Sequence, residues 1–308
     1  MISSGAEESQ VGEQGRALTA QESELAAEAG YYQLALRRFR KHRPAMVSLI
    51  VLAVIAVASI VGPWLLPADF NRPHLETRFL APGFPHLMGT DELGRDILYR
   101  ILQGGRISIS VGVAATLVVL AMGVSIGVLS GYFGGWLDNL LMRLTDAVLS
   151  IPAIFLLILV MTGYGHTPQI LVLGIGLTLW PDTARIIRSV VMSVREKDFV
   201  EAARAVGSSH LTIVLKHILP NSLGPIMVAA TLSIGTAVLT ESTLSYLGLG
   251  IGAPLSSWGN TLNAAQDAIW EAPYYALFPG LMILITVLGV NFIGDGLRDA
   301  FDPRSFER

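Results

Sequence analysis

The sequence contains no cysteine and little charge: charged residues make up 15% of its 308 positions, and hydrophobic residues make up 52%. Without cysteine, disulfide bonds and thiolate metal sites are excluded, although this absence does not decide the compartment. A soluble domain normally carries about 25% charged residues, so the composition indicates a protein whose solvent is largely the lipid bilayer. The formal net charge of -3 gives no reason to expect nucleic acid as a partner.

Lysine is also scarce. None of Lys41, Lys197 and Lys216 follows a GxxxxG pattern or precedes the serine or threonine of a phosphate-binding loop. The chain by itself is therefore not expected to hydrolyse ATP. The histidines at 166, 210 and 217 are too scattered for metal-ligand spacing. We expect no catalytic residue, no metal site and no cofactor in this chain.

Six apolar stretches approach the roughly 20 residues that a helix needs to cross about 30 Å of hydrocarbon. The bilayer offers no hydrogen-bond partners to the backbone, which favours helices in such segments. We therefore predict an all-α, polytopic membrane protein with six transmembrane helices. Asp182 and Arg185 interrupt the fourth, so we expect it to lie partly inside the bundle. The predicted spans are Ala45–Leu66, Ile109–Ser130, Ala147–Met161, Ile170–Ile187, Leu223–Leu247 and Tyr275–Ile293.

Basic residues indicate the orientation. A cluster directly before the first span is expected to stay in the cytoplasm, which places both termini and the basic loop before the fifth span inside. The loop at 67–106 carries five arginines yet must then face outward, against this rule. The predicted organisation is a flexible cytoplasmic tail over 1–44, a membrane domain over 45–297 with a cytoplasmic loop at 188–222, and a C-terminal cytoplasmic tail over 298–308. The basic cluster comprises Arg37, Arg38, Arg40, Lys41 and Arg43.

Small residues mark one face of the second predicted span. Gly123, Gly127 and Gly131 recur every four residues and so lie on the same side of a helix. Such a face lets another helix backbone approach closely. We predict a helix-packing surface there, followed by an aromatic interfacial anchor over Gly131–Trp136.

The cytoplasmic loop contains the sequence DFVEAARAVGSSHLTIVLKHILP over 198–220 and predicts two short helices. Asp198 and Glu201 have the spacing of a capping box, which predicts that the first helix begins at Asp198. We expect this helix to extend to Val206 and to end at Gly207, a natural helix stop.

The second helix of the loop can be capped by Ser208 or Ser209 and is expected to end at Pro220. Its apolar residues recur at i, i+3, i+4 and i+7, which predicts one apolar stripe. These stripe residues are Leu211, Val214, Leu215 and Ile218.

The same loop resembles the signature of the permease subunits of binding-protein-dependent ABC importers. That signature is Glu-Ala-Ala, three residues, Gly, nine residues, a hydrophobic residue, a spacer and Leu-Pro; here His217 stands at the hydrophobic position. The resemblance implies a surface that couples the permease to separate ATPase subunits, which would bind the ATP and Mg²⁺. The implied coupling residues are Glu201, Ala202, Ala203, Gly207, Leu219 and Pro220.

Two further blocks resemble the C-type subunit of the dipeptide/oligopeptide/nickel permease family. They are GTDELGRD at 89–96 and GDGLRD at 294–299, the latter followed by Asp302-Pro303. The resemblance spans nearly the whole chain and implies a type I importer fold in a bacterial or archaeal plasma membrane. It also implies a second homologous permease, two ATPase subunits or domains and an extracytoplasmic binding protein that delivers di- or oligopeptides. Nickel or another small solute is the alternative substrate.

Two local predictions concern charged residues. Thr90 can cap a helix over 91–103, in which Asp96 and Arg100 would form an i, i+4 ion pair. Asp182 can pair with Arg185 in the fourth span. Both predictions rest on spacing alone.

Glu241 places a carboxylate inside the fifth predicted span, where it is costly unless it faces the bundle interior or water. It could line a translocation path and contact a substrate amine. The favoured interpretation is a hydrogen-bonded helix-packing carboxylate, flanked by Thr240 and Ser242.

Two other classes of function remain open. An ion-coupled secondary transporter would need ion-binding carboxylates at the membrane midplane and would not need the Glu201 loop. A non-transporting membrane scaffold would leave solute uptake unchanged when the chain is deleted.

Overall fold

The computed structural model describes residues 33–252 and 254–301. Most of the predicted tail over 1–44, and residues 302–308 of the predicted C-terminal tail, lie outside this range, so their predicted structure is not tested. The described residues form α-helices, short 3-10 helices and one π-helical turn, with no β-strand among them. The prediction of an all-α fold is confirmed.

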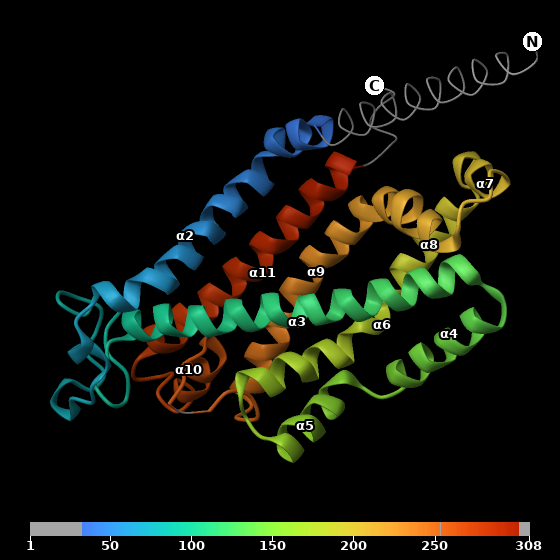
Figure 1. Ribbon diagram of the computed structural model, residues 1–308. Coiled ribbons are helices and arrows are strands. Elements are labelled where there is room, and N and C mark those ends of the chain that lie inside the picture. The colour runs from blue at the N-terminus through green and yellow to red at the C-terminus, as the bar shows by residue number, and fades with distance from the viewer. Residues whose placement is uncertain (1–32, 253, 302–308) are drawn as a thin grey trace, which may run out of the picture.

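Five helices are long and apolar enough to cross a membrane, and they lie alongside one another in an elongated bundle (Figure 1). The five are α2 (Arg43–Leu65), α3 (Ile97–Phe133), α6 (Pro168–Arg195), α9 (Leu219–Tyr246) and α11 (Pro273–Phe301). The shorter elements are η1 (Ala68–Asn71), η2 (Leu75–Thr77), α4 (Gly135–Leu149), α5 (Ala153–Tyr164), α7 (Asp198–Ala205), α8 (His210–Ile213), η3 (Val214–Ile218) and α10 (Trp258–Ala264).

The third predicted span, Ala147–Met161, is not one straight helix. The chain breaks between Leu149 and Ala153, and the axes of α4 and α5 differ by 78°. Pro152 explains the break, because it disfavours helical backbone in the residue before it and has no N–H to donate. The prediction of six spans therefore holds only if the bent pair counts as one crossing.

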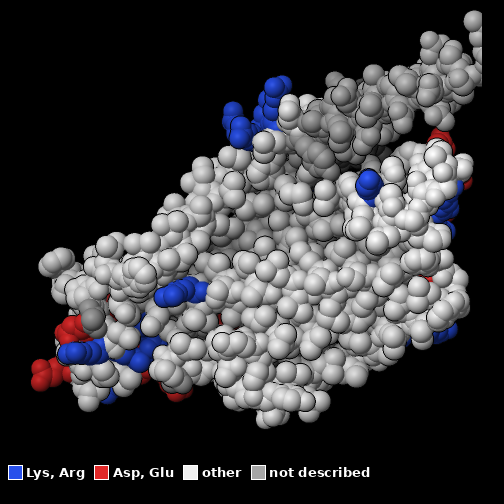
Figure 2. Space-filling view, viewed as in Figure 1, with Lys and Arg blue, Asp and Glu red and all other residues white. Residues whose placement is uncertain are grey.

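The two ends of the bundle differ. α7 and α8 lie at one end, which we call the loop end, together with the start of α2 and the finish of α11; η1, η2 and α10 lie at the other, the cap end (Figure 1). Figure 2 shows lysine, arginine, aspartate and glutamate gathered near these two ends, whereas the surface between them is nearly free of charge. This distribution suits an apolar belt bounded by two aqueous regions.

α3 begins later than the sequence predicted. Asp96 is its N-cap, because the Asp96 carboxylate accepts a hydrogen bond from the backbone N–H of Tyr99 at 2.8 Å. Thr90 instead lies before α3, at the cap end of the molecule. Its hydroxyl oxygen accepts a hydrogen bond from the Leu80 N–H. Arg100 lies 3.6 Å from Asp91 and not against the Asp96 carboxylate, so the predicted helix start and ion pair are both wrong.

The glycine face of α3 packs directly on α6, as predicted. A Cβ atom placed on Gly127 would lie 2.7 Å from the Ala184 carbonyl oxygen, and one on Gly131 would lie 2.7 Å from the Arg188 carbonyl oxygen. Only hydrogen in place of a side chain allows this approach. α6 is also the most enclosed of the five long helices, because 56% of its most apolar 18-residue segment is buried. This confirms the prediction that the fourth span lies partly inside the bundle.

Two ion pairs join elements that are far apart in sequence. The Arg188 guanidinium donates two hydrogen bonds of 2.6 Å to the Asp138 carboxylate, which ties α6 to α4. Arg185 donates to Asp146 at 2.6 Å. The predicted pairing of Arg185 with Asp182 is therefore wrong, since Arg185 points toward α4.

Candidate functional site

The first arm of the loop is α7. Lys197 occupies the N-cap position without a side-chain cap hydrogen bond, so the predicted capping box of Asp198 and Glu201 does not form. Both acids lie in the first turn of the helix, where their negative charges interact favourably with the partial positive charge of the helix N-terminus. The helix starts at Asp198 as predicted and ends at Ala205, one residue before the predicted Val206, which is its C-cap. Gly207 follows with a φ of 85°, in the left-handed region that glycine adopts most easily.

The second arm begins at Ser209, whose hydroxyl accepts a hydrogen bond from the Thr212 N–H at 3.3 Å. α8 then continues through the π-helical turn η3 directly into α9. Pro220 does not end the helix, because it occupies the first turn of α9 after the wider π turn, where its missing N–H is tolerated. The second arm is thus the continuous extension of a membrane-spanning helix.

The π turn also changes which residues face inward. Ile213 and Ile218, five residues apart, are both fully buried, whereas Leu211 is 68% and Leu215 is 53% exposed. The predicted stripe assumed a helix with 3.6 residues per turn. A π turn has hydrogen bonds between residues five positions apart, so it shifts which residues face inward after it. Half of the predicted apolar stripe therefore faces outward, where it is free to meet another protein.

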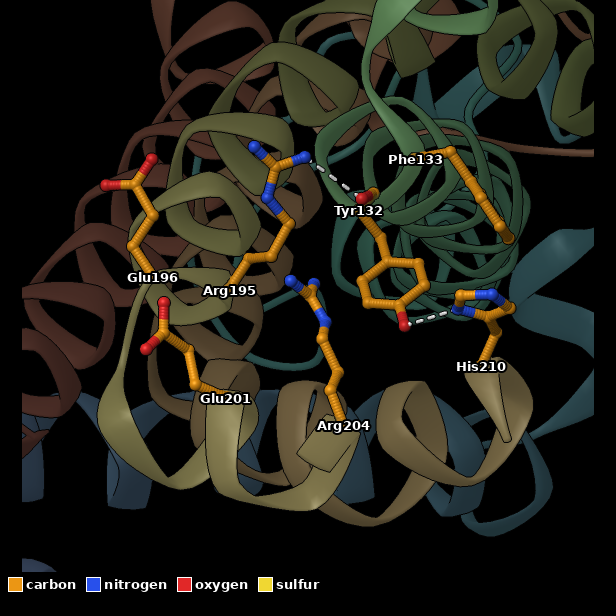
Figure 3. A pocket seen from close by; sticks show the side chains of 7 residues that line it. All are labelled: Tyr132, Phe133, Arg195, Glu196, Glu201, Arg204 and His210. Atoms are coloured by element: carbon orange, nitrogen blue, oxygen red, sulfur yellow. Dashed lines mark hydrogen bonds between the residues drawn. The ribbon is translucent and has the colours of Figure 1, made fainter. Parts of the chain in front are cut away.

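The end of α3 anchors both arms of the loop. The Tyr132 hydroxyl lies 2.8 Å from Nδ1 of His210 on the second arm, and the guanidinium carbon of Arg204 on the first arm lies 5.6 Å from the Tyr132 ring centre. Arg195 at the end of α6 donates to the Tyr132 carbonyl oxygen at 3.0 Å. Figure 3 shows these side chains converging around Tyr132. The sequence indicated an aromatic anchor here but not its protein partners.

An open pocket of about 360 Å³ lies between the loop and the ends of α3 and α6. Glu201 is exposed at its edge and forms no ion pair with any described residue, although Arg195 and Arg204 line the same pocket (Figure 3). Its carboxylate is thus available to a partner. The lining residues are Tyr132, Phe133, Arg195, Glu196, Glu201, Arg204 and His210.

The six coupling residues implied by the sequence divide into two groups. Glu201, Ala202 and Gly207 are exposed, whereas Ala203, Leu219 and Pro220 are half-buried. Ala203 and Leu219 pack against the apolar cluster that contains Val200 and Ile213. The first group can meet a partner, and the second attaches the loop to the bundle.

Glu241 lies far from this loop and exposes none of its surface. Its carboxylate accepts hydrogen bonds from Ser108 and Ser245, both at 2.8 Å, and from Ser242 at 3.3 Å. Ser108 also accepts from the backbone N–H of Trp258 at 3.2 Å, which joins α3, α9 and α10. These bonds support the packing interpretation. Of the two flanking residues, Ser242 donates to Glu241, whereas the Thr240 hydroxyl donates to the Thr236 carbonyl oxygen. The donors Ser108 and Ser245 were not predicted.

Comparison with known proteins decides the family. Residues 123–307 match the family described as the binding-protein-dependent transport system inner membrane component. This chain belongs to that family of permeases. Residues 30–82 of the permease also match the N-terminal transmembrane domain of oligopeptide transport permease C. It is accordingly a multi-pass inner-membrane protein.

Two relatives cover nearly the same length as the permease. The dipeptide transport system permease protein DppC of Alkalihalophilus pseudofirmus is 40% identical over 270 residues, which cover 88% of this chain and 89% of that protein. The oligopeptide transport system permease protein OppC of Escherichia coli K12 is 43% identical over 275 residues, covering 89% and 91%.

A solved structure supports the fold independently. A chain of the MetNI methionine ABC transporter, in an inward-facing conformation, superposes with a TM-score of 0.57. The match covers 67% of the permease and 98% of that chain at 20% identity. The permease therefore has the fold of an ABC importer permease.

Proposed function

We propose that this permease is the membrane-spanning C-type subunit of an ATP-driven importer for di- or oligopeptides. Its relatives are named as dipeptide and oligopeptide transport permeases, which favours peptides over nickel as the substrate. An extracytoplasmic binding protein would deliver the peptide to the cap end, and a second homologous permease would complete the path. Two ATPase subunits or domains would bind ATP and Mg²⁺ at the cytoplasmic loop end.

The observation that carries this proposal is the construction of the two-armed loop. Its first arm presents Glu201 and Ala202 outward, and its second arm is continuous with α9. A movement imposed on the loop by an ATPase would reach α9 through unbroken helix and α3 through Tyr132. Allosteric coupling requires such an element, whose arrangement both sites can bias.

The coupling residues follow from this arrangement. We propose that Glu201, Ala202 and Gly207 contact the ATPase, while Ala203, Leu219 and Pro220 hold the loop in place. The small Ala202 side chain permits close approach, and Glu201 supplies a charge for a basic group on the ATPase. The exposed Leu211 side chain adds apolar contact area.

Charge reversal in the loop tests the coupling. In a complex reconstituted with its permease partner, ATPases and binding protein, Glu201→Lys and Gly207→Asp should abolish peptide uptake and the ATPase activity that the binding protein stimulates. Asp295→Lys is the matched control, because Asp295 is an exposed acid at the same end of the molecule but outside the loop. Normal uptake and normal ATPase binding by Glu201→Lys would refute the coupling role.

The substrate is tested separately in a strain that lacks the gene. Uptake of labelled di- and tripeptides should be lost and then restored by the intact chain, whereas nickel uptake should not change. Loss of nickel uptake alone would exclude peptide transport. Unchanged uptake of every solute would support the scaffold hypothesis.

A further inference from the structure

One carboxylate lies in the middle of a spanning helix without a partner. Asp182 is fourteen residues after Pro168, where α6 begins, and thirteen before Arg195, where it ends. Its side chain is exposed and forms no hydrogen bond or ion pair with any described residue. Arg185, which could have neutralised it from one turn away, is bonded to Asp146.

A carboxylate at this depth is poorly compatible with lipid. Charged residues in spanning helices almost always face the bundle interior or a water-filled cavity. The exposed face of α6 around Asp182 is therefore not expected to contact acyl chains in the assembled transporter. It requires water or polar groups opposite it.

α2 shows how a lipid-facing surface of this protein is built. Its outward side carries large apolar residues such as Val47, Val54 and Val57, whereas Ser48 and Ser59 are turned inward and buried. Around Asp182 the outward side of α6 and α9 is mixed: Asp182 and Thr236 are exposed there beside the apolar Ile186 and Leu232. α2 carries no acidic residue, so an exposed carboxylate distinguishes the surface of α6 from that of α2.

Asp182 lines a small pocket of about 130 Å³ between α6 and α9. Ser233, which also lines it, lies fourteen residues after Leu219 and thirteen before Tyr246, in the middle of α9. Substrate sites of transporters commonly lie near the bilayer midplane. The lining residues are Leu179, Asp182, Thr183, Ile186, Ala229, Leu232, Ser233 and Thr236.

A row of threonines extends this polar surface toward the cap end. Thr236, Thr240 and Thr243 have helical spacing and lie on one face of α9. Each donates its hydroxyl proton to the carbonyl oxygen four residues earlier, at 3.1, 2.7 and 2.8 Å respectively. Their oxygen atoms keep acceptor capacity. Carboxylate and hydroxyl oxygens together form a surface that accepts hydrogen bonds, which suits a ligand with a cationic amine and N–H groups.

We propose that the exposed face of α6 and α9 lines the translocation path and that Asp182 binds the protonated amino terminus of the passing peptide. The threonine row would accept hydrogen bonds from the peptide N–H groups. This inference rests on the proposed peptide transport. It assigns the substrate contact to Asp182 and not to Glu241, because three serines already satisfy the buried Glu241 carboxylate.

The test uses the complete transporter in proteoliposomes with a labelled tripeptide. Asp182→Asn should lower uptake about tenfold or more, since a hydrogen bond to a charged group is lost. Asp182→Glu should restore most of it. ATPase stimulation by the loaded binding protein should persist, because Asp182 is remote from the coupling loop. A tripeptide with a photoreactive group beside its amino terminus should crosslink to residues 168–195 or 219–246.

A second variant keeps the test informative if Asp182→Asn fails to fold. Thr236→Val should lower uptake with normal assembly, whereas Thr162→Val should not. Thr162 is the matched control because it makes the same hydroxyl-to-carbonyl bond on the exposed face of α5.

Four results would overturn the inference: full uptake by Asp182→Asn, equal effects of the two threonine variants, crosslinks confined to other helices, or loss of the partner permease as the sole defect of Asp182→Asn. The last would assign Asp182 to subunit assembly. Absence of peptide uptake by the unaltered transporter would instead refute the proposed function.

Discussion

Tyr132 joins the two arms of the loop to α3. Tyr132→Phe tests one of its interactions, the hydrogen bond with His210. The substitution removes the hydroxyl that lies 2.8 Å from His210 and keeps the buried ring under Arg204. A neutral hydrogen bond contributes about 1 kcal/mol net. At room temperature this corresponds to roughly a fivefold change in the equilibrium between the docked and undocked loop.

Hydrogen exchange measures that equilibrium directly. Amides of residues 198–213 should exchange about fivefold faster in Tyr132→Phe, while amides of α2 should not change. In the reconstituted transporter, ATP hydrolysis should persist with fewer peptides moved per ATP. This uncoupling follows because a loosely held loop transmits less of the ATPase movement to α3.

Two further variants separate the hydrogen bond from the packing. Tyr132→Ala also removes a ring that is 4% exposed, and loss of a buried aromatic side chain costs about 3–5 kcal/mol. It should therefore destabilise the whole loop end. In a double-mutant cycle, Tyr132→Phe and His210→Ala should be non-additive by about 1 kcal/mol. Additive effects, or unchanged exchange in Tyr132→Phe, would refute the anchoring role.

Three other substitutions test packing and buried polar groups, each by thermal unfolding in detergent. Gly127→Val should separate α3 from α6, because its Cβ would lie 2.7 Å from the Ala184 carbonyl oxygen. Such overpacking costs about 1–3 kcal/mol. A normal melting temperature would contradict the close contact. Arg188→Ala should destabilise by about 1–3 kcal/mol, since it removes the two hydrogen bonds that Arg188 donates to the Asp138 carboxylate and leaves the bond from Ser130. Asp138→Ala should add little to it. Ser108→Ala should cost about 1–3 kcal/mol by removing a donor from buried Glu241, and Ser110→Ala, on an exposed face of α3, should be neutral.

Several features could be predicted from the local sequence alone. Long apolar runs predicted the spanning helices, because a backbone in lipid must satisfy its own hydrogen bonds. The four-residue spacing of Gly123, Gly127 and Gly131 predicted the packing face, and Gly207 predicted the end of the first arm. Each of these outcomes depends on residues that are neighbours along the chain.

Other features depended on residues distant in sequence. Leu211 and Leu215 of the predicted apolar stripe face outward, because the π turn at Val214–Ile218 shifts the helical register. The periodicity of the sequence does not predict that turn. Arg185 paired with Asp146, thirty-nine positions away, and not with nearby Asp182. Spacing along one helix shows which pairs are possible, but a neighbouring helix decides which pair forms.

The sequence by itself determined that this protein is a helical membrane protein with a two-armed loop, because the bilayer and the glycine positions act locally on the chain. The resemblance of that loop to an importer signature implied a permease. Only the tertiary structure decided that Tyr132 anchors that loop, that three serines enclose Glu241 and that Asp182 faces outward. Burial and hydrogen-bond partners come from the packing of α3, α6, α9 and α10 against one another, and no single segment specifies that packing.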